Sequence, residues 1–162
     1  MYKLGDIVCF DNLIFGDGVR DKKIDRPCMV LCTYTTSNGE ELLFCMPFTS
    51  QIKNFNKRPY SYFIVPDIIF SVKKLSFVKI NNLFVKNINE AKDTGLSVNL
   101  SKENINSLRS KINRYSKKEG KYYSIVELIL DYNEKIDEND KNNISKKLER
   151  KLKKIMVEEN NM

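Results

Sequence analysis

Short apolar runs, separated by polar and glycine-containing segments, fill the first half of the chain. Residues 4–11, 27–35 and 41–48 are rich in β-branched and aromatic side chains, which favours strands. Asn38-Gly39 separates the second run from the third and is a strong signal for a tight turn. The pattern therefore predicts a β-hairpin preceded by one further strand.

The rest of the first half extends this sheet. Apolar runs at residues 62–70 and 75–85 predict two more strands, and residues 12–25 and 50–61 are expected to be loops. Pro47 cannot donate a ladder hydrogen bond, so we expect the third strand to end or to meet a sheet edge there. Together these elements predict a compact, mostly antiparallel sheet of short strands, close to a small barrel.

The hydrophobic period changes beyond about residue 87. Ser101 is a suitable N-cap, and the apolar positions after it recur every three or four residues, as in an amphipathic helix. The same period predicts helices at 122–135 and 142–157, the last with Lys and Arg opposite its apolar face. We therefore expect an α+β protein with a barrel domain at 1–116 and a helical extension at 117–162. The apolar positions of the first helix are Ile105, Leu108, Ile112 and Tyr115.

The composition of the chain favours polyanionic partners and excludes acid–base catalysis by histidine. The formal net charge is +7 and the pI is about 9.1, and each Lys or Arg that contacts a phosphate releases a counterion. A Lys- and Arg-rich helix face is nevertheless more often simply solvated. The chain has no histidine, so proton transfer would need other side chains or electrostatic stabilisation.

The four cysteines all lie inside apolar runs, which indicates small buried side chains in a reducing compartment. Cys28 and Cys32 are too far apart for a short metal clip, and a mixed Cys/His zinc site is excluded without histidine. No run approaches the roughly 18 apolar residues of a membrane span. The N-terminal segment also lacks the layout of a signal peptide. A soluble, cytoplasmic protein without a membrane partner is expected.

Polar side chains stand at the ends of the two hairpin strands. Arg26 precedes Pro27, which favours an extended backbone at the residue before it, and Thr49 and Ser50 follow the third strand. In an antiparallel hairpin, the start of one strand lies beside the end of its partner. Arg26 is farther from the turn than Thr49, and a bulge would absorb this offset. We therefore expect a guanidinium and a hydroxyl to meet at one end of the sheet.

Two loops leave the sheet at this end and would complete a cationic corner. An arginine fork matches phosphate oxygens and can stabilise charge on a reacting phosphorus, while a hydroxyl can orient a nucleophile. A purely structural role is the alternative, because a Thr-Ser pair often caps a strand or turn. The polar loop candidates include Lys22, Lys23, Gln51 and Lys53, and the aromatic candidates for base stacking are Phe15, Phe55 and Tyr60.

Five of these elements follow one another in an order that resembles the MazF/PemK/Kid toxins of type II toxin–antitoxin systems. They are Gly-Asp-Ile-Val at 5–8, a loop, Arg26-Pro27 before an apolar strand, a hairpin, and Thr49-Ser50 after the next strand. The resemblance covers roughly residues 3–115. It implies a small SH3-like antiparallel barrel of the MazF/CcdB type, usually a homodimer. It also implies an endoribonuclease that needs neither metal nor cofactor.

The same resemblance implies a reaction and roles for residues. The 2′-hydroxyl of single-stranded RNA would attack the adjacent phosphate and leave a 2′,3′-cyclic phosphate and a 5′-hydroxyl. By position, Arg26 matches the catalytic arginine of the family and Thr49 its hydroxyl residue, accompanied by Ser50. Phe15, Gly16 and the basic residues up to Lys23 would belong to a loop over the RNA. A cognate antitoxin would bind the groove and block it.

Two features depart from the family pattern. The segment 81–84 lacks the cation that the family often carries on its long strand, and residues 117–162 exceed the usual length. Type III toxins, which share the fold and are inhibited by an RNA, also have extra helices, and they are the second candidate. A non-catalytic binding or inhibitor protein on the same barrel is the third, and a member that has lost activity is the fourth.

Overall fold

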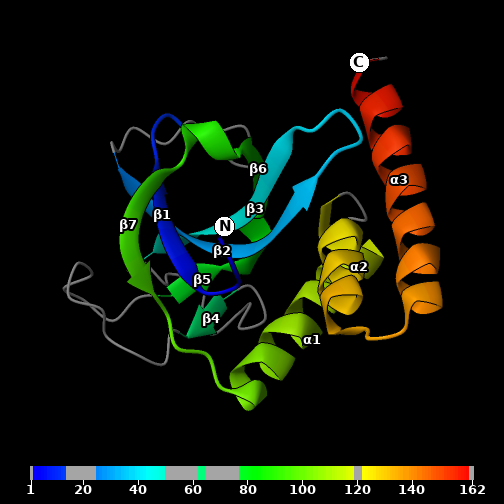
Figure 1. Cartoon of the computed structure of the whole chain (residues 1–162). Helices are drawn as coiled ribbons and strands as arrows, with labels where there is room; N and C mark the ends of the chain where they lie inside the picture. Colours follow the sequence, from blue (N-terminus) through cyan, green and yellow to red (C-terminus); the bar gives the residue numbers. More distant parts are fainter. Residues whose placement is uncertain (1, 14–24, 50–61, 65–76, 119–121, 161–162) are drawn as a thin grey trace. The chain divides into compact units, whose positions relative to one another are not determined.

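The computed structural model describes residues 2–13, 25–49, 62–64, 77–118 and 122–160 (Figure 1). Within these ranges the chain has seven strands followed by three α-helices, which confirms the predicted α+β class. It divides into two compact units, Met1–Lys111 and Ile112–Met162. The division falls inside the first helix, near the boundary at 116 and 117 that the sequence suggested.

The predicted hairpin forms the centre of the sheet. Strand β2 (Arg26–Thr35) pairs antiparallel with β3 (Glu41–Thr49) around the Asn38-Gly39 turn. Gly39 has a φ of 81°, a conformation that other residues rarely adopt, and its N–H donates to the carbonyl of Thr36 at 2.9 Å. Both strands are buried along most of their length, which explains why their apolar runs are continuous and not alternating.

A bulge in β2 sets the register of this hairpin. Val30 pairs with Cys45, whereas Cys32 pairs with Phe44, so one residue of β2 is left over between them. This is the kind of offset that counting outward from the turn predicts. Beyond the bulge Cys28 pairs with Pro47.

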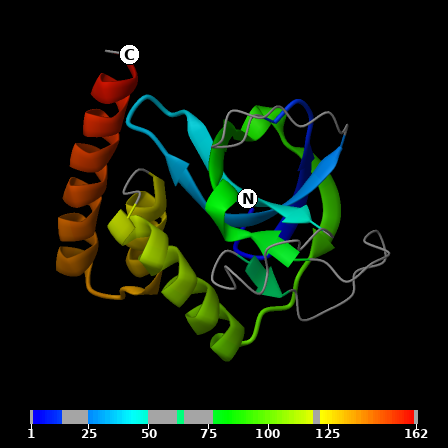
Figure 2. The same cartoon turned by 180° about the vertical axis from the view of Figure 1, so that it is seen from behind.

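The remaining strands extend the sheet on both sides of the hairpin. The paired order is β4 (Tyr62–Ile64), β5 (Phe77–Lys79), β3, β2, β1 (Asp6–Phe10) and β7 (Lys92–Ser97), and β6 (Phe84–Asn87) also pairs with β3. The sheet is strongly curved, as the view from behind shows (Figure 2). In the part of the chain that the structure describes, no ladder joins β4 to β7, so the sheet is not closed.

Of the two alternatives expected at Pro47, an end of the third strand or an unpaired edge, the first is wrong, because β3 continues to Thr49. One edge of β3 pairs with β6 at residues 42–45 and with β5 at residues 48–49. Pro47 lies between these two ladders, where that edge has no strand partner among the described residues. The missing N–H of proline is tolerated at such a position.

The sequence also predicts one continuous strand at 75–85, and this is wrong in its middle. A single turn of 3₁₀-helix, η2 (Ile80–Asn82), separates β5 from β6. Ile80 and Asn82 are both buried there. A second short turn, η3 (Ile88–Glu90), follows β6 and leads into β7.

No pattern in the sequence predicts β7. Its residues are mostly exposed, and Lys, Asp and Gly are poor strand formers. Tertiary contacts hold it instead: it pairs antiparallel with β1, and the Thr94 hydroxyl donates to the carbonyl of Ile7 at 2.6 Å.

The core of the first unit is formed mainly by side chains of β1, β2 and β3. Phe10 and Phe84 meet edge to face with ring centroids 5.4 Å apart. Three of the four cysteines are buried, as predicted, and all four are free thiols. Burial raises the pKa of the thiols of Cys32 and Cys45, so both stay protonated and behave as small apolar side chains. The cluster consists of Val8, Phe10, Leu13, Cys28, Val30, Leu43, Cys45 and Phe84.

The first and third helices each begin at a capping side chain. Helix α1 (Lys102–Lys118) starts after Ser101, whose hydroxyl accepts from the N–H of Asn104 at 3.1 Å, so the predicted N-cap is confirmed. Helix α2 (Tyr122–Glu134) lies within its predicted range. Helix α3 (Glu138–Asn160) starts earlier than predicted, because the carboxylate of Asp137 accepts from the N–H of Asn139 at 2.7 Å.

The second unit is held together by contacts between apolar side chains of its helices and by hydrogen bonds to one carboxylate. The rings of Tyr115 and Tyr123 stack with centroids 5.1 Å apart. The carboxylate of Glu127 accepts hydrogen bonds from the side chains of Asn113 and Ser116. None of the described helices is both long and apolar enough to cross a membrane. Among the described side chains, the buried hydrophobic residues of α2 and α3 are Tyr123, Ile125, Val126, Ile129, Leu130, Leu148 and Ile155.

Candidate functional site: an arginine at a strand end

Arg26 is fixed at the first position of β2. Its backbone pairs with Phe10 of β1, and its Nη1 donates to the carbonyl oxygen of Phe48 on β3 at 3.2 Å. The residue is half-buried, so part of its surface remains accessible to solvent. A cation fixed in this way keeps its orientation without being sealed from a ligand.

Thr49 is the last residue of β3 and lies between β2 and β5. It pairs with Phe77 on one side, and it is half-buried like Arg26. The Cys28–Pro47 register, continued by two positions, places Thr49 opposite Arg26 on the other side. This register places the two residues at the same end of the hairpin, and the predicted contact between the guanidinium and the hydroxyl stays a prediction.

Both residues belong to the same face of the hairpin. Side chains alternate along a strand, so Arg26 shares the face of Cys28, and Thr49 shares the face of Cys45. Those two cysteines are part of the buried cluster. Arg26 and Thr49 thus stand where the apolar face ends, and we call this pair with the Phe48 carbonyl the strand-end corner.

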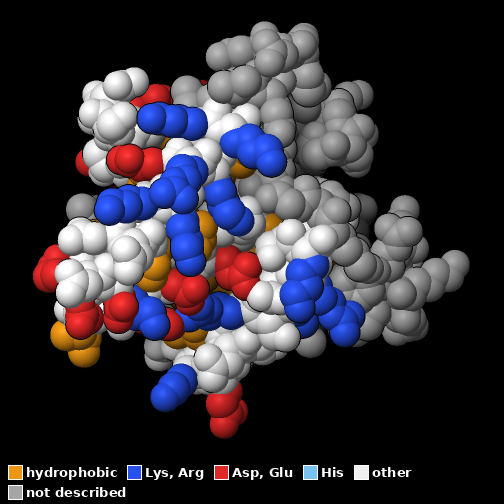
Figure 3. Space-filling model, turned by 90° about the vertical axis from the view of Figure 1, so that its right-hand side faces the viewer, with side chains coloured by type: hydrophobic (Ala, Val, Ile, Leu, Met, Phe, Trp, Pro, Cys, Tyr) orange, Lys and Arg blue, Asp and Glu red, His pale blue; other side chains and the backbone are white. Residues whose placement is uncertain are grey.

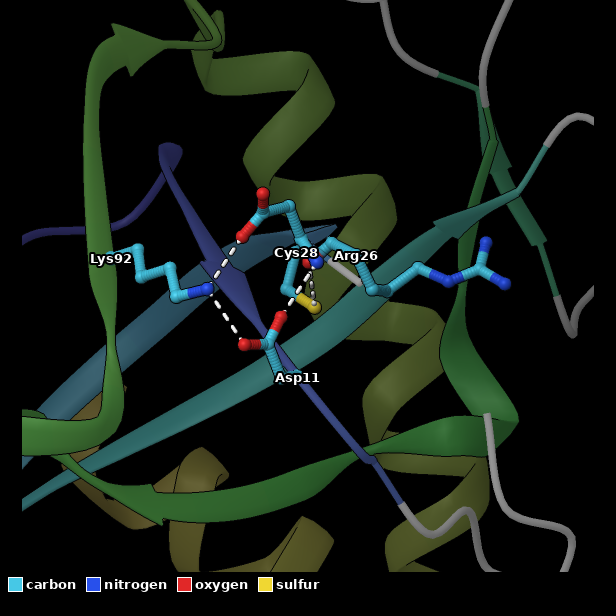
Figure 4. Close-up of polar contacts among 5 residues, drawn as sticks. Asp11, Arg26, Cys28 and Lys92 are labelled. Carbon is cyan, nitrogen blue, oxygen red and sulfur yellow. Dashed lines mark hydrogen bonds and ion pairs between the residues drawn. The ribbon is translucent and has the colours of Figure 1, made fainter. Parts of the chain in front are cut away.

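An ion cluster that the sequence did not predict lies next to this corner. The ammonium of Lys92 on β7 contacts Asp11 at 2.6 Å and Asp25 at 2.7 Å. The N–H of Asp25 also donates to the carboxylate of Asp11 at 2.7 Å. Figure 4 shows the Lys92 ammonium directed at Asp11, while the side chain of Arg26 extends the other way.

This cluster sets the backbone just before Arg26. Asp25 has a φ of 56°, in the left-handed region that Asp tolerates better than most residues. Its N–H is held by Asp11 at the end of β1, and its carboxylate by Lys92 on β7. Arg26 therefore follows a residue anchored to two other segments of the sheet.

The charges of the cluster support one another. The hydrogen bonds that the Lys92 ammonium donates to the Asp11 and Asp25 carboxylates raise the pKa of Lys92, and the bond accepted from Lys92 lowers the pKa of Asp11. The pKa of the neighbouring Cys9 thiol is raised, first by burial and then by the charge of Asp25. Lys92 and Asp11 are therefore both ionised near neutral pH.

The sequence holds little that could reveal this cluster. Lys92 is separated from Asp25 by 67 positions and from Asp11 by 81. It lies on β7, the strand that the hydrophobic pattern does not predict. The only local signal is that both aspartates border the loop at 12–25 that precedes Arg26.

The other predicted site residues lie outside the described part of the chain. Their predicted contacts with RNA stay predictions. Among the residues that the structure describes, no group of three or more His, Cys, Asp or Glu side chains is arranged to hold a metal ion. The residues concerned are Phe15, Gly16, Lys22, Lys23, Ser50, Gln51 and Lys53, together with Phe55 and Tyr60.

The described corner joins one guanidinium, one hydroxyl position and a backbone carbonyl at the end of an apolar face. Such an arrangement suits an anion with several oxygen atoms, because arginine donates from a planar fork and threonine adds a single donor. Comparison with known proteins finds no match for the chain: no family model matches it, and neither a curated protein nor a solved structure is significantly similar to it.

Proposed function

We propose that this protein is an endoribonuclease that cuts single-stranded RNA at the strand-end corner, as the toxin of a toxin–antitoxin system. The observation that carries the proposal is the fixed, half-exposed Arg26 at the same end of the hairpin as Thr49. The order of sequence elements that resembles the MazF/PemK/Kid toxins supports it. On this view the curved sheet is an SH3-like barrel of the MazF/CcdB type.

The proposed reaction is a transesterification within the RNA. The 2′-oxygen forms a bond to the adjacent phosphorus, and the bond from phosphorus to the 5′-oxygen breaks. One proton leaves the 2′-hydroxyl and one reaches the departing 5′-oxygen, so the products are a 2′,3′-cyclic phosphate and a 5′-hydroxyl. This step requires no redox partner.

Arg26 and Thr49 would divide the work on the phosphate. Negative charge grows on the non-bridging oxygens as the fifth bond to phosphorus forms, and a fixed guanidinium stabilises it. The Nη1 contact to the Phe48 carbonyl at 3.2 Å orients the guanidinium before substrate arrives. The Thr49 hydroxyl would donate to a phosphate oxygen. Without a histidine in the chain, electrostatic stabilisation would carry most of the catalysis.

The deciding experiment compares the wild-type chain with the Arg26→Ala variant on a single-stranded RNA of mixed sequence. We expect cleavage by the wild type in the presence of EDTA, with 2′,3′-cyclic phosphate and 5′-hydroxyl ends. The variant should lose activity by about a thousandfold or more, because one preorganised donor contributes about 10²–10³ and a full charge contributes more. Circular dichroism would establish that the variant is folded. A folded variant that cuts as fast as the wild type would reject the site.

A type III toxin, inhibited by an RNA, is the second candidate. The three helices that follow the sheet favour it, because the described chain continues well beyond the sheet. The two candidates differ in the neighbouring gene: a short protein gene supports type II, and a repeated RNA locus supports type III. A homodimer and a cognate antitoxin in either form belong to the proposal. If wild-type protein cuts no RNA yet still inhibits growth, a non-catalytic inhibitor becomes the better description.

A further inference from the structure

Helix α3 carries a dense group of positive side chains that the strand-end corner does not use. Six of them are exposed, and they lie within a stretch of about 12 Å along the helix. At about 100° per residue, they fall within an arc of about 160°, opposite the buried Leu148 and Ile155. We call these six residues the basic face: Lys146, Lys147, Arg150, Lys151, Lys153 and Lys154.

Figure 3 shows Lys and Arg side chains at the surface, with acidic side chains between some of them. In the sequence, Glu149 is the only acidic residue between Lys141 and Ile155. Within the described residues, no ion pair joins any member of the basic face to a carboxylate. The charge of this face is therefore directed at solvent.

The spacing of these charges is unfavourable for an isolated helix. Lys146 and Arg150 are four positions apart, as are Lys147 and Lys151, and Arg150 and Lys154. Like charges at this spacing destabilise a helix by about 0.2–0.5 kcal/mol per pair. A surface helix that is merely solvated commonly alternates Glu with Lys, which turns the same spacing into attraction. Here the repulsion is left in place, and a bound polyanion would relieve it.

We propose that the basic face of α3 binds the sugar–phosphate backbone of the single-stranded RNA substrate, as an attachment surface separate from the residues that cut it. The identity of the ligand rests on the proposed ribonuclease function. Lysines on flexible stems follow a single strand of any sequence, because they bind phosphates as point charges. This face should therefore raise affinity without selecting bases.

The test uses the full-length chain with Arg26→Ala, so that labelled RNA stays intact during binding. The face variant adds Lys147→Glu, Arg150→Glu and Lys151→Glu. A matched control adds Lys3→Glu, Lys102→Glu and Lys135→Glu, three exposed lysines outside the basic face. In the Arg26→Ala background each set changes the formal charge by six, from +6 to 0, so bulk charge is equal in the two proteins.

We expect the face variant to bind a 20-nucleotide single-stranded RNA at least about tenfold more weakly than the control at 0.1 M salt. The slope of log K against log salt should become flatter by about 2, since three phosphate contacts each contribute about 0.7 for a single strand. In the active background, KM should rise while kcat stays within about twofold. Equal affinities for face variant and control would overturn the inference, and so would a loss seen only with duplex DNA or only with an acidic protein.

The two proposals can fail separately. If the wild type does not cleave RNA, the ribonuclease assignment is wrong. The comparison of RNA binding between the face variant and the control still tests the role of α3. Retention of cleavage, with no difference in binding between face variant and control, would remove only the role of α3. Helical content measured by circular dichroism establishes that each variant is folded.

Discussion

The strand-end corner and the basic face of α3 both present positive charge, and they hold it in opposite ways. In the corner a single guanidinium is oriented by the Phe48 carbonyl at 3.2 Å and by the pairing of β2 with β1. On α3 six flexible side chains share one exposed surface without a carboxylate partner among the described residues. A positioned charge suits chemistry at one atom, whereas a spread of mobile charges suits attraction of a polyanion.

This difference predicts that the corner depends on the kind of cation and the helix face only on its charge. Arg26→Lys should lower kcat for RNA cleavage by about 10²–10³, because a lysine cannot reproduce the planar fork. The matched change on the helix, Arg150→Lys, should alter kcat and KM by less than about twofold. Steady-state cleavage of one labelled RNA measures both. Equal effects at the two positions would erase the distinction.

Thr49 should show the next largest effect. Thr49→Val removes the hydroxyl while keeping the branched shape that suits a strand, so we expect a loss of about 10–100-fold in kcat with little change in unfolding temperature. Thr49→Ser keeps the hydroxyl and should retain most of the activity. If Val and Ser variants are equally active, the hydroxyl takes no part in the reaction and Thr49 is a structural residue.

The hairpin could be predicted from the sequence because its signals are local. Asn38-Gly39 specifies a turn, the flanking apolar runs specify strands, and antiparallel pairing then brings Arg26 beside the end of β3. The remainder depends on contacts that no local pattern records. β7 is a strand because it pairs with β1, and η2 breaks a run of strand-forming residues at Asn81 and Asn82.

The same reason explains why the Lys92 cluster was missed. A lysine in a polar segment resembles any exposed lysine until the fold brings it to Asp11 and Asp25. One of its two partners, Asp25, nevertheless immediately precedes Arg26, the residue with the most specific proposed role. Local patterns thus indicate the group that is proposed to act on the phosphate, whereas only the tertiary structure shows the contacts that hold Asp25 beside it.

Lys92 is accordingly predicted to be a positioning residue. Lys92→Met leaves the two carboxylates facing each other without a cation, which should displace Asp25 and with it Arg26. We expect kcat to fall by about five- to tenfold with KM nearly unchanged, since small displacements of a catalytic group slow the reaction more than they weaken binding. Lys92→Arg should restore most of the rate. A loss in KM alone would show that Lys92 attracts RNA and does not position Arg26.

The effect of Lys92→Met on stability should depend on pH in a definite direction. The pKa of Asp11 is lowered in the folded state, so its contribution is present above its ordinary pKa of 3.8 and is lost as pH falls through the lowered value. The pKa of Lys92 is raised, so its contribution is complete below its ordinary value of 10.5 and is lost only at more alkaline pH. Wild type and variant should therefore differ in unfolding temperature between about pH 5 and pH 10 and converge in acid.

The smallest expected effect is a change in folding stability, measured without RNA. Removing positive charge should stabilise the protein on α3 and destabilise it in the strand-end corner. Arg150 has four like-charged neighbours at helical spacings of three or four: Lys146, Lys147, Lys153 and Lys154. Arg150→Glu converts four repulsions into attractions, so it should stabilise the helical unit by about 2 kcal/mol at low salt and by much less at 1 M salt. Removing charge from the corner, as in Arg26→Ala, should instead destabilise the fold, because a half-buried hydrogen bond to Phe48 is lost. Denaturant unfolding followed by circular dichroism measures both. A destabilising effect of Arg150→Glu would show that the cations of α3 already have structural partners within the protein. The basic face would then, like Arg26, be held by the fold, and its charge would not be available to bind a ligand.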